Sequence, residues 1–228
     1  MDYLARYRNG EHREVTAELT RLTPLRGAAL AQARAVAELA MAQVAQNCGL
    51  IAARLAAHGY AWSLWCDPND GGGVSAPLVA SGVAARERIR ARAGALPLTL
   101  DCFWSAVGGV AFTGTHPDFP GLLDPLVVCP AEDVLSQLDD CEPEADGLLH
   151  LPLSPDVYHK DNISGGPAYS VAVPQAGFDF VLLDEARGAC FLDYLREVIL
   201  RRGGFAALDP DAPGAVPLAA LTAGLRPF

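Results

Sequence analysis

The feature that most constrains the fold is a long amphipathic stretch over residues 28–58. Its apolar positions recur mostly three or four residues apart and are Leu30, Val36, Ala40, Val44, Cys48, Ile51 and Leu55. This period predicts one long helix with a single buried stripe, and Gly59 is placed to end it. Residues 11–22 show a shorter version of the pattern and stop at Thr23-Pro24. We therefore expect a helical hairpin that packs its alanine-rich face closely on the rest of the chain.

The remainder of the chain mixes both kinds of periodicity. Apolar spacing predicts helices over residues 79–93, 97–107, 130–138 and 190–202. Alternating or aromatic-rich runs predict strands over residues 60–65, 110–113, 126–129, 148–153, 169–173 and 178–183. A PQAG turn at 174–177 joins the last two strands. The pattern predicts an α+β fold, with a mixed, largely antiparallel sheet flanked by helices.

Length and composition favour one domain with an ordinary core. The chain has 228 residues, of which 51% are hydrophobic, so it is long enough to bury a sizeable core. We expect a single α+β domain over 1–228. It would comprise a helical extension at 1–59, an α+β core at 60–205 and a Pro/Ala-rich tail at 206–228.

The charge is unevenly distributed along the chain. The net charge is −10, and residues 1–100 carry eleven arginines and eight carboxylates, whereas residues 101–228 carry six basic groups and nineteen carboxylates. An acidic second half argues against binding to a nucleic-acid backbone, which needs clustered Lys and Arg. It would suit a basic protein partner by speeding encounter. Solubility alone is the other explanation.

Cysteine usage and the amino terminus point to a reduced, cytoplasmic protein. The six cysteines include no CxxC pair, which leaves a zinc site of that kind without support. The first residues, MDYLARYRNGEHRE, lack an apolar signal core. No uninterrupted apolar run of about 18 residues occurs, so we expect no membrane association.

The most polar motif lies in the segment 150–174, HLPLSPDVYHKDNISGGPAYSVAVP. Its polar side chains are Asp156, Tyr158, His159, Lys160, Asp161, Asn162 and Ser164, and Lys160 is the only lysine in the chain. Asp, Asn and Ser shape turns by bonding to nearby backbone groups. The pair Gly165-Gly166 allows positive φ or a close backbone approach. One interpretation is a rigid structural loop, and the other is a recognition surface held by rigid elements.

Catalytic, metal and phosphate sites are weaker interpretations of these residues. Asp156, His159 and Asp161 could do acid–base work with Ser164 as nucleophile, but no G-x-S-x-G elbow is present. Mixed metal ligands could come from Asp156, His159, Asp161 and His116, but no helical His-x-x-x-His pair supports them. The glycines of residues 66–73 lack a following GK[ST]. We expect no catalytic residues, no metal and no cofactor.

Several segments together resemble a bacterial group related to the SUKH superfamily. They are LPLTLDCFWSAVGGVAFTGTHPDF, DPLVVCP, LSPDVYHKDNISGGPAYSVAVP and FLDYLREVILRRGGF, with EHREV and HGYAW before them. The link to the wider superfamily rests on the proline-led helix from Pro97 to Trp104 followed by Gly108-Gly109. The superfamily includes regulators of fungal cell-wall assembly and bacterial immunity proteins that bind and block toxin domains. The resemblance implies a SUKH-like α+β fold and a role without catalytic residues or cofactor.

The combined expectation is a non-enzymatic protein-binding module, of the immunity type, that binds and neutralises a toxin domain. The alternatives are a small hydrolase-like enzyme centred on Asp156 and His159, and a regulatory scaffold without a toxin partner. The predicted binding face joins the 156–169 loop with the acidic run 132–146 beside it. Its residues are Asp156, Tyr158, His159, Lys160, Asp161, Asn162, Ser164, Tyr169, Glu132, Asp139 and Asp140.

Overall fold

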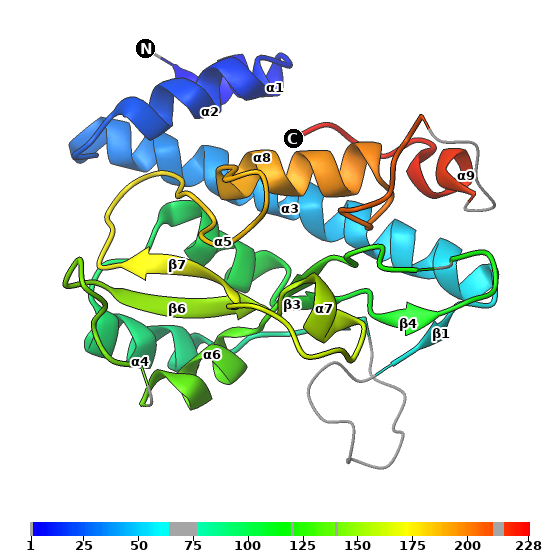
Figure 1. The fold of residues 1–228 in the computed structure, drawn as a ribbon. Coiled ribbons are helices and arrows are strands. Elements are labelled where there is room, and N and C mark those ends of the chain that lie inside the picture. The colour runs from blue at the N-terminus through cyan, green and yellow to red at the C-terminus, as the bar shows by residue number, and fades with distance from the viewer. Residues whose placement is uncertain (1, 64–76, 120, 140, 212–216) are drawn as a thin grey trace.

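The computed structural model describes residues 2–63, 77–119, 121–139, 141–211 and 217–228, and its architecture is α+β (Figure 1). Its helices are α1 Tyr3–Arg8, α2 His12–Arg21, α3 Gly27–Ala57, α4 Val83–Ala93, α5 Leu98–Ala106, α6 Ala131–Leu138, α7 Val157–Lys160, α8 Phe191–Arg196, the π-helix η1 Glu197–Arg201 and α9 Leu218–Thr222. Its strands are β1 Ala61–Trp62, β2 Leu78–Val79, β3 Gly109–Ala111, β4 Gly114–Thr115, β5 Val127–Val128, β6 Leu149–Ser154 and β7 Tyr169–Val173. The glycine-rich segment 66–73 and the end of the predicted strand 60–65 lie outside the described residues.

Helix α3 is the long helix that the sequence predicts, and the other elements pack around it. The predicted stripe is buried from Val36 to Leu55, whereas Leu30 at its start is exposed. Helix α5 lies along α3 on the side of the strands, and α1, α9 and η1 contact it elsewhere. Figure 1 shows α3 running the length of the molecule between α8 and the sheet layer.

The amino-terminal part contains three helices in its described residues, not the two of the predicted hairpin. Helix α1 was not predicted because it is only six residues long, too short for its apolar residues to show a period. It is held by Arg6, which pairs with Glu11 and Glu18 at 2.8 Å each, and by Tyr7, which is buried. Helix α2 matches the predicted segment 11–22.

The strands form three small antiparallel sheets in the described part of the chain. The pairings are β1 with β4, β2 with β3 and β5, and β6 with β7. The expected single mixed sheet is therefore wrong in detail, although the α+β class is confirmed. The backbone N–H of Cys129, just after β5, donates to Leu153 O at 2.7 Å and links the second and third sheets.

The predicted strand at 178–183 is wrong. It makes only isolated bridges, between Ser170 and Leu183 and between Val181 and Cys190. At its start the chain bonds to the amino terminus of α5 instead: Leu98 N donates to Gly177 O, just before the segment, and Thr99 N donates to Phe178 O. The free N–H groups of a helix start thus take the carbonyls where a strand was expected to begin.

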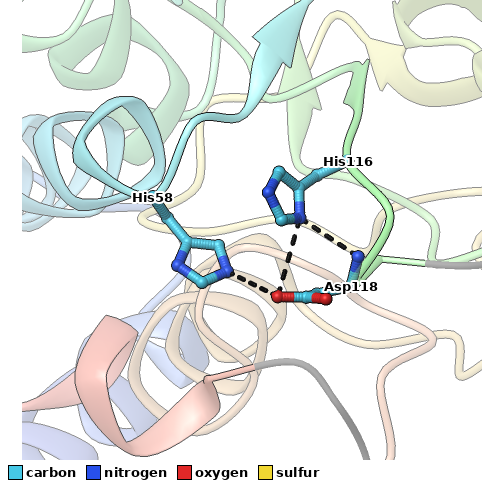
Figure 2. A group of neighbouring side chains, drawn as sticks. All are labelled: His58, His116 and Asp118. Atoms are coloured by element: carbon cyan, nitrogen blue, oxygen red, sulfur yellow. Dashed lines mark hydrogen bonds and ion pairs between the residues drawn. The ribbon is translucent and has the colours of Figure 1, made fainter.

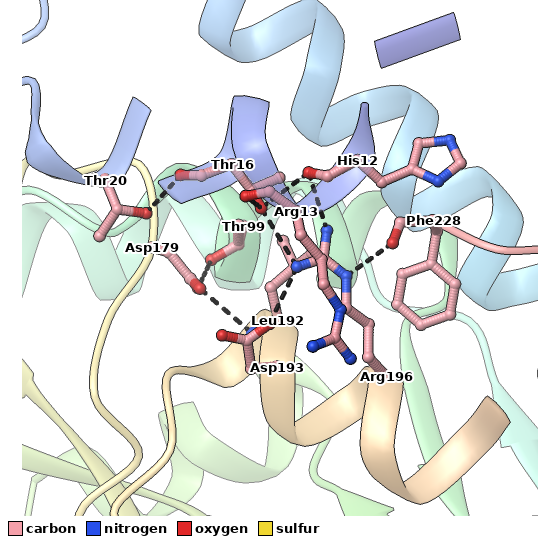
Figure 3. Close-up of polar contacts among 10 residues, drawn as sticks. All are labelled: His12, Arg13, Thr16, Thr20, Thr99, Asp179, Leu192, Asp193, Arg196 and Phe228. Carbon is pink, nitrogen blue, oxygen red and sulfur yellow. Dashed lines mark hydrogen bonds and ion pairs between the residues drawn. The ribbon is translucent and has the colours of Figure 1, made fainter. Parts of the chain in front are cut away.

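A buried arginine joins the two ends of the chain (Figure 3). From α8, Arg196 donates to Phe228 O at 2.6 Å, to Thr16 Oγ1 at 3.1 Å and to His12 O at 3.3 Å. Nearby, the buried Asp179 accepts from Thr99 Oγ1 at 2.8 Å and from Leu192 N at 3.2 Å. Burial raises the pKa of Asp179 to about 6, although these hydrogen bonds oppose the shift. We call this group the terminal junction.

One hydrophobic cluster includes residues from Tyr7 near the start to Phe228 at the end. Both terminal regions therefore contribute to the same core. Within the described residues, no helix combines the length and the apolar character needed to cross a bilayer.

Candidate functional site

The candidate site is the loop of residues 155–168 that connects β6 to β7, and it begins with the one-turn helix α7. Asp156 caps this helix: its Oδ1 accepts from Tyr158 N at 2.7 Å and from His159 N at 3.1 Å. Its Oδ2 lies 2.8 Å from His159 Nδ1. Burial favours the neutral acid, but the His159 ring and the two backbone N–H groups outweigh it and lower the pKa of Asp156. The sequence analysis expected a rigid loop here but did not predict its capped helical turn.

Backbone hydrogen bonds close the turn after α7. Lys160 N donates to Asp156 O, Asp161 N and Ile163 N both donate to Tyr158 O, and Asn162 N donates to His159 O. Asn162 adopts a positive φ of 59°, a conformation that Asn tolerates better than most residues. The chain then returns past Asp156, where a Cβ at Gly165 would lie 2.3 Å from Asp156 Oδ1. The predicted close backbone approach at this glycine is confirmed.

The base of the loop is a buried ion pair. The Lys160 side chain is fully buried, and its Nζ lies 2.5 Å from Asp124 Oδ1. Tyr169 contributes its ring face, 4.6 Å from Nζ, and its hydroxyl, which donates to Asp124 Oδ2 at 3.2 Å. Burial lowers the pKa of Lys160, and the attraction to Asp124 partly offsets that effect. The pair anchors α7 to the segment just before β5.

The structure divides the predicted loop residues into two groups. Asp156, Lys160 and Tyr169 are buried and support the loop from below, so they have no surface to offer a partner. The exposed residues are Tyr158, His159, Asp161, Asn162 and Ser164. The sequence argument missed Ile163, which is 50% exposed beside Tyr158 at 47%. We call the six exposed residues 158, 159 and 161–164 the loop face.

The acidic run 132–146 approaches β6 at both ends of the strand. Cys129 N, just before α6, donates to Leu153 O near the end of β6 where the loop begins, and Glu144 N donates to Leu148 O just before β6. A joint face of this run with the loop stays a prediction. Glu132 is already engaged, accepting from Ser81 Oγ at 2.9 Å and from Gly82 N at 2.5 Å. Asp140 lies outside the described residues.

The loop has part of a catalytic geometry. His159 and Asp156 form a hydrogen-bonded pair, but within the described chain no hydrogen bond joins His159 to Ser164. Three surface cavities, of about 290, 340 and 310 Å³, lie around α2 and the terminal junction. None of these three contains Asp156 or His159.

His116, which the sequence analysis considered as a metal ligand together with Asp156, has other neighbours. His116 lies with His58 and Asp118 (Figure 2). His58 Nε2 is 3.0 Å from Asp118 Oδ2, and His116 Nδ1 is 3.8 Å from the same oxygen. The sequence argument missed His58 because 58 residues separate it from His116 and no local spacing connects them.

Comparisons of this chain with protein-family models, with curated proteins and with solved structures give no match. The resemblance to the SUKH-related group stays a prediction.

Proposed function

We propose that this protein is a non-enzymatic protein-binding module of the immunity type, and that the loop face contacts its partner. The observation that supports this proposal most is a rigid turn that holds two large side chains in solvent. Tyr158 and Ile163 are 47% and 50% exposed, and Tyr158 O accepts the N–H groups of both Asp161 and Ile163. Few rotamers and backbone angles remain to be ordered on binding, which lowers the entropic cost.

The chemistry of the loop face also fits a protein partner. Binding energy in protein interfaces concentrates in a few aromatic and apolar anchors surrounded by polar groups. Here an aromatic and an aliphatic side chain stand among His159, Asp161 and Asn162. The net charge of −10 favours a basic partner, since complementary charge raises association rates. A basic toxin domain has that character.

The proposal includes two broader predictions. The fold is a SUKH-like variant of the α+β class, with α1 to α3 added before its core. The protein acts in the cytoplasm, where its cysteines stay reduced, and Cys48 and Cys102 are buried thiols in the described residues.

The test measures the affinity for a basic toxin domain encoded beside this chain. Tyr158→Ala and Ile163→Ala should each weaken binding at least tenfold, as expected for interface anchors. Leu30→Ala is the matched control because it removes an exposed leucine from α3, and its affinity should not change. Affinity should also fall with added salt. Unchanged affinity in both loop variants would remove the loop face from the proposal.

A hydrolase-like enzyme is the second candidate, and the 2.8 Å contact between His159 and Asp156 favours it. The carboxylate would orient the ring for proton transfer. Turnover of an activated ester that is lost in His159→Ala and kept in Tyr158→Ala would support this candidate over binding.

A further inference from the structure

A second site lies where the end of α3 meets the chain that follows β4. His58 is the residue after α3, and His116 and Asp118 follow β4 within a short turn. One ligand atom from each of the three residues lies within 4.8 Å of the others. We propose that His58, His116 and Asp118 bind a divalent transition metal ion, with Zn²⁺ as the preferred ion.

The distances in this group suit a metal ion. Zn²⁺ binds imidazole nitrogen and carboxylate oxygen at about 2.0–2.2 Å. Two such ligands in tetrahedral geometry stand about 3.4 Å apart. The nitrogen–oxygen separations here, 3.0 Å from His58 and 3.8 Å from His116, lie on either side of that value. Small side-chain adjustments would bring all three atoms onto one ion.

The ligand atoms also have suitable lone pairs. The backbone N–H of Asp118 donates to His116 Nδ1 at 3.0 Å, so the neutral ring has its proton on Nε2 and an unprotonated Nδ1. A metal would replace this N–H as the partner of Nδ1. At His58, it would replace the proton between Nε2 and Asp118 Oδ2. Figure 2 shows both nitrogens directed toward the Asp118 carboxylate.

The surroundings hold the rings in place and leave access from solvent. Phe119, which is buried, packs edge-on against both rings, with centroids 5.9 Å from His58 and 5.8 Å from His116. The side chains of His58, His116 and Asp118 are 33%, 17% and 43% exposed. Three protein ligands and this exposure leave the fourth position to water. Two imidazoles with one carboxylate select Zn²⁺ and its first-row neighbours over Ca²⁺ or Mg²⁺.

The bound ion would connect the end of α3 to the chain between β4 and β5, which carries the residue that supports the loop face. Six residues beyond Asp118 lies Asp124, the partner of Lys160. A metal ion bound to Asp118 would restrain the segment that carries Asp124. Metal binding would therefore add to the rigidity of the loop base.

The test titrates Zn²⁺ alone into the full, tag-free chain by calorimetry. We expect one ion per chain, and at least a tenfold loss of affinity in both His58→Ala and Asp118→Asn. His150→Ala is the matched control, since His150 also pairs with a carboxylate, Asp146, at 3.1 Å but has no third ligand within the described part of the chain. Its affinity should equal that of the wild type. Affinity should fall on acidification because protons compete for the imidazoles.

A second measurement uses the wild-type chain, so it does not depend on how well the variants fold. Added Zn²⁺ should shift the proton NMR signals of the His58 and His116 rings. The ring signals of the other three histidines should stay unchanged. When Co²⁺ is bound in place of Zn²⁺, the absorption spectrum should lack the charge-transfer band of a thiolate ligand. No stoichiometric binding, binding that survives both substitutions, or a thiolate band would each overturn the proposal.

Discussion

Lys160 and Arg196 are both buried cations, but the protein neutralises them in different ways. Among the residues that the structure describes, Lys160 has one ionic partner, Asp124, together with the ring of Tyr169. Arg196 distributes its guanidinium over Asp193 and several neutral acceptors. The Asp193 side chain is 60% exposed, so the arginine depends mostly on buried carbonyl and hydroxyl oxygens.

The difference follows from the two side chains and indicates two roles. An ammonium is a point charge, whereas a guanidinium presents five donors in a fixed plane and can bond to several elements at once. The lysine therefore stabilises one local feature, the base of the loop face. The arginine joins α2, α8 and the last residue of the chain. A substitution of Lys160 should loosen the loop face, whereas a substitution of Arg196 should loosen the packing of the two ends of the chain.

The largest effect is expected for Lys160→Ala. It leaves the Asp124 carboxylate buried without its cation, which costs about 3–5 kcal/mol of unfolding free energy. Urea denaturation measures this loss. In the double variant Lys160→Met with Asp124→Asn, both charges are removed, and more than half of the loss should be recovered. Asn suits position 124 because its φ is 49°. If the double variant loses as much unfolding free energy as the two single variants together, Lys160 and Asp124 are not coupled.

The next effect is expected for Arg196→Lys. Lysine keeps the charge but cannot reach Phe228 O, Thr16 Oγ1 and His12 O together, so buried acceptors lose their donors. We expect a loss of about 2–3 kcal/mol, again by urea denaturation. Arg201→Lys is the control because the Arg201 side chain is 59% exposed, and it should stay within about 0.5 kcal/mol of the wild type. Equal stabilities for the two variants would contradict the role of the junction.

A pH-dependent effect should separate the two regions further. The pKa of Asp179 rises on folding from its ordinary value of 3.8 to about 6, so the folded state holds this proton more tightly. This contribution to stability is present below about pH 4 and is lost as pH rises to about 6. Its size is on the order of 2 kcal/mol. Thermal melts of wild type and Asp179→Asn between pH 4 and 7 should show the difference. Parallel stability curves for the two proteins would rule this contribution out.

The smallest expected effect compares two adjacent glycines of the loop. In Gly165→Ala the new Cβ would meet Asp156 Oδ1 at 2.3 Å, whereas in Gly166→Ala it would lie 3.8 Å from Asp156 Oδ2. We expect a loss of about 1–2 kcal/mol for the first, from the overpacked cap, and almost none for the second. Denaturant midpoints for the pair provide the measurement. A larger loss at Gly166 would mean that the chain does not pass Asp156 in this way.

The sequence predicted elements whose signal is local. Helix α3 was predicted because its apolar positions recur every three or four residues from Leu30 to Leu55, and α5 and α6 were predicted from the same kind of apolar spacing. The glycine pair indicated either a positive φ or a close backbone approach, and the structure shows the close approach at Gly165. In each of these cases, residues near one another in the chain determine the structure.

Features that depend on distant residues could not be predicted in the same way. Lys160 is buried because Asp124, 36 residues earlier, receives its charge. The 178–183 segment has the composition of a strand, but it makes isolated bridges to Ser170 and Cys190, and its first carbonyl bonds to the start of α5. Pairing between distant segments, which leaves no periodic signal, decides both outcomes.

The central claim is that a buried ion pair holds residues 157–163 as a rigid face, and amide hydrogen exchange tests it most directly. The amides of Lys160, Asp161, Asn162 and Ile163 donate to carbonyls of the same turn. They should exchange at least tenfold more slowly than those of Ser164 and Gly166 in the wild type, and should lose this protection in Lys160→Ala before the amides of α3 do. Equal, rapid exchange across residues 160–166 in the wild type would contradict the account.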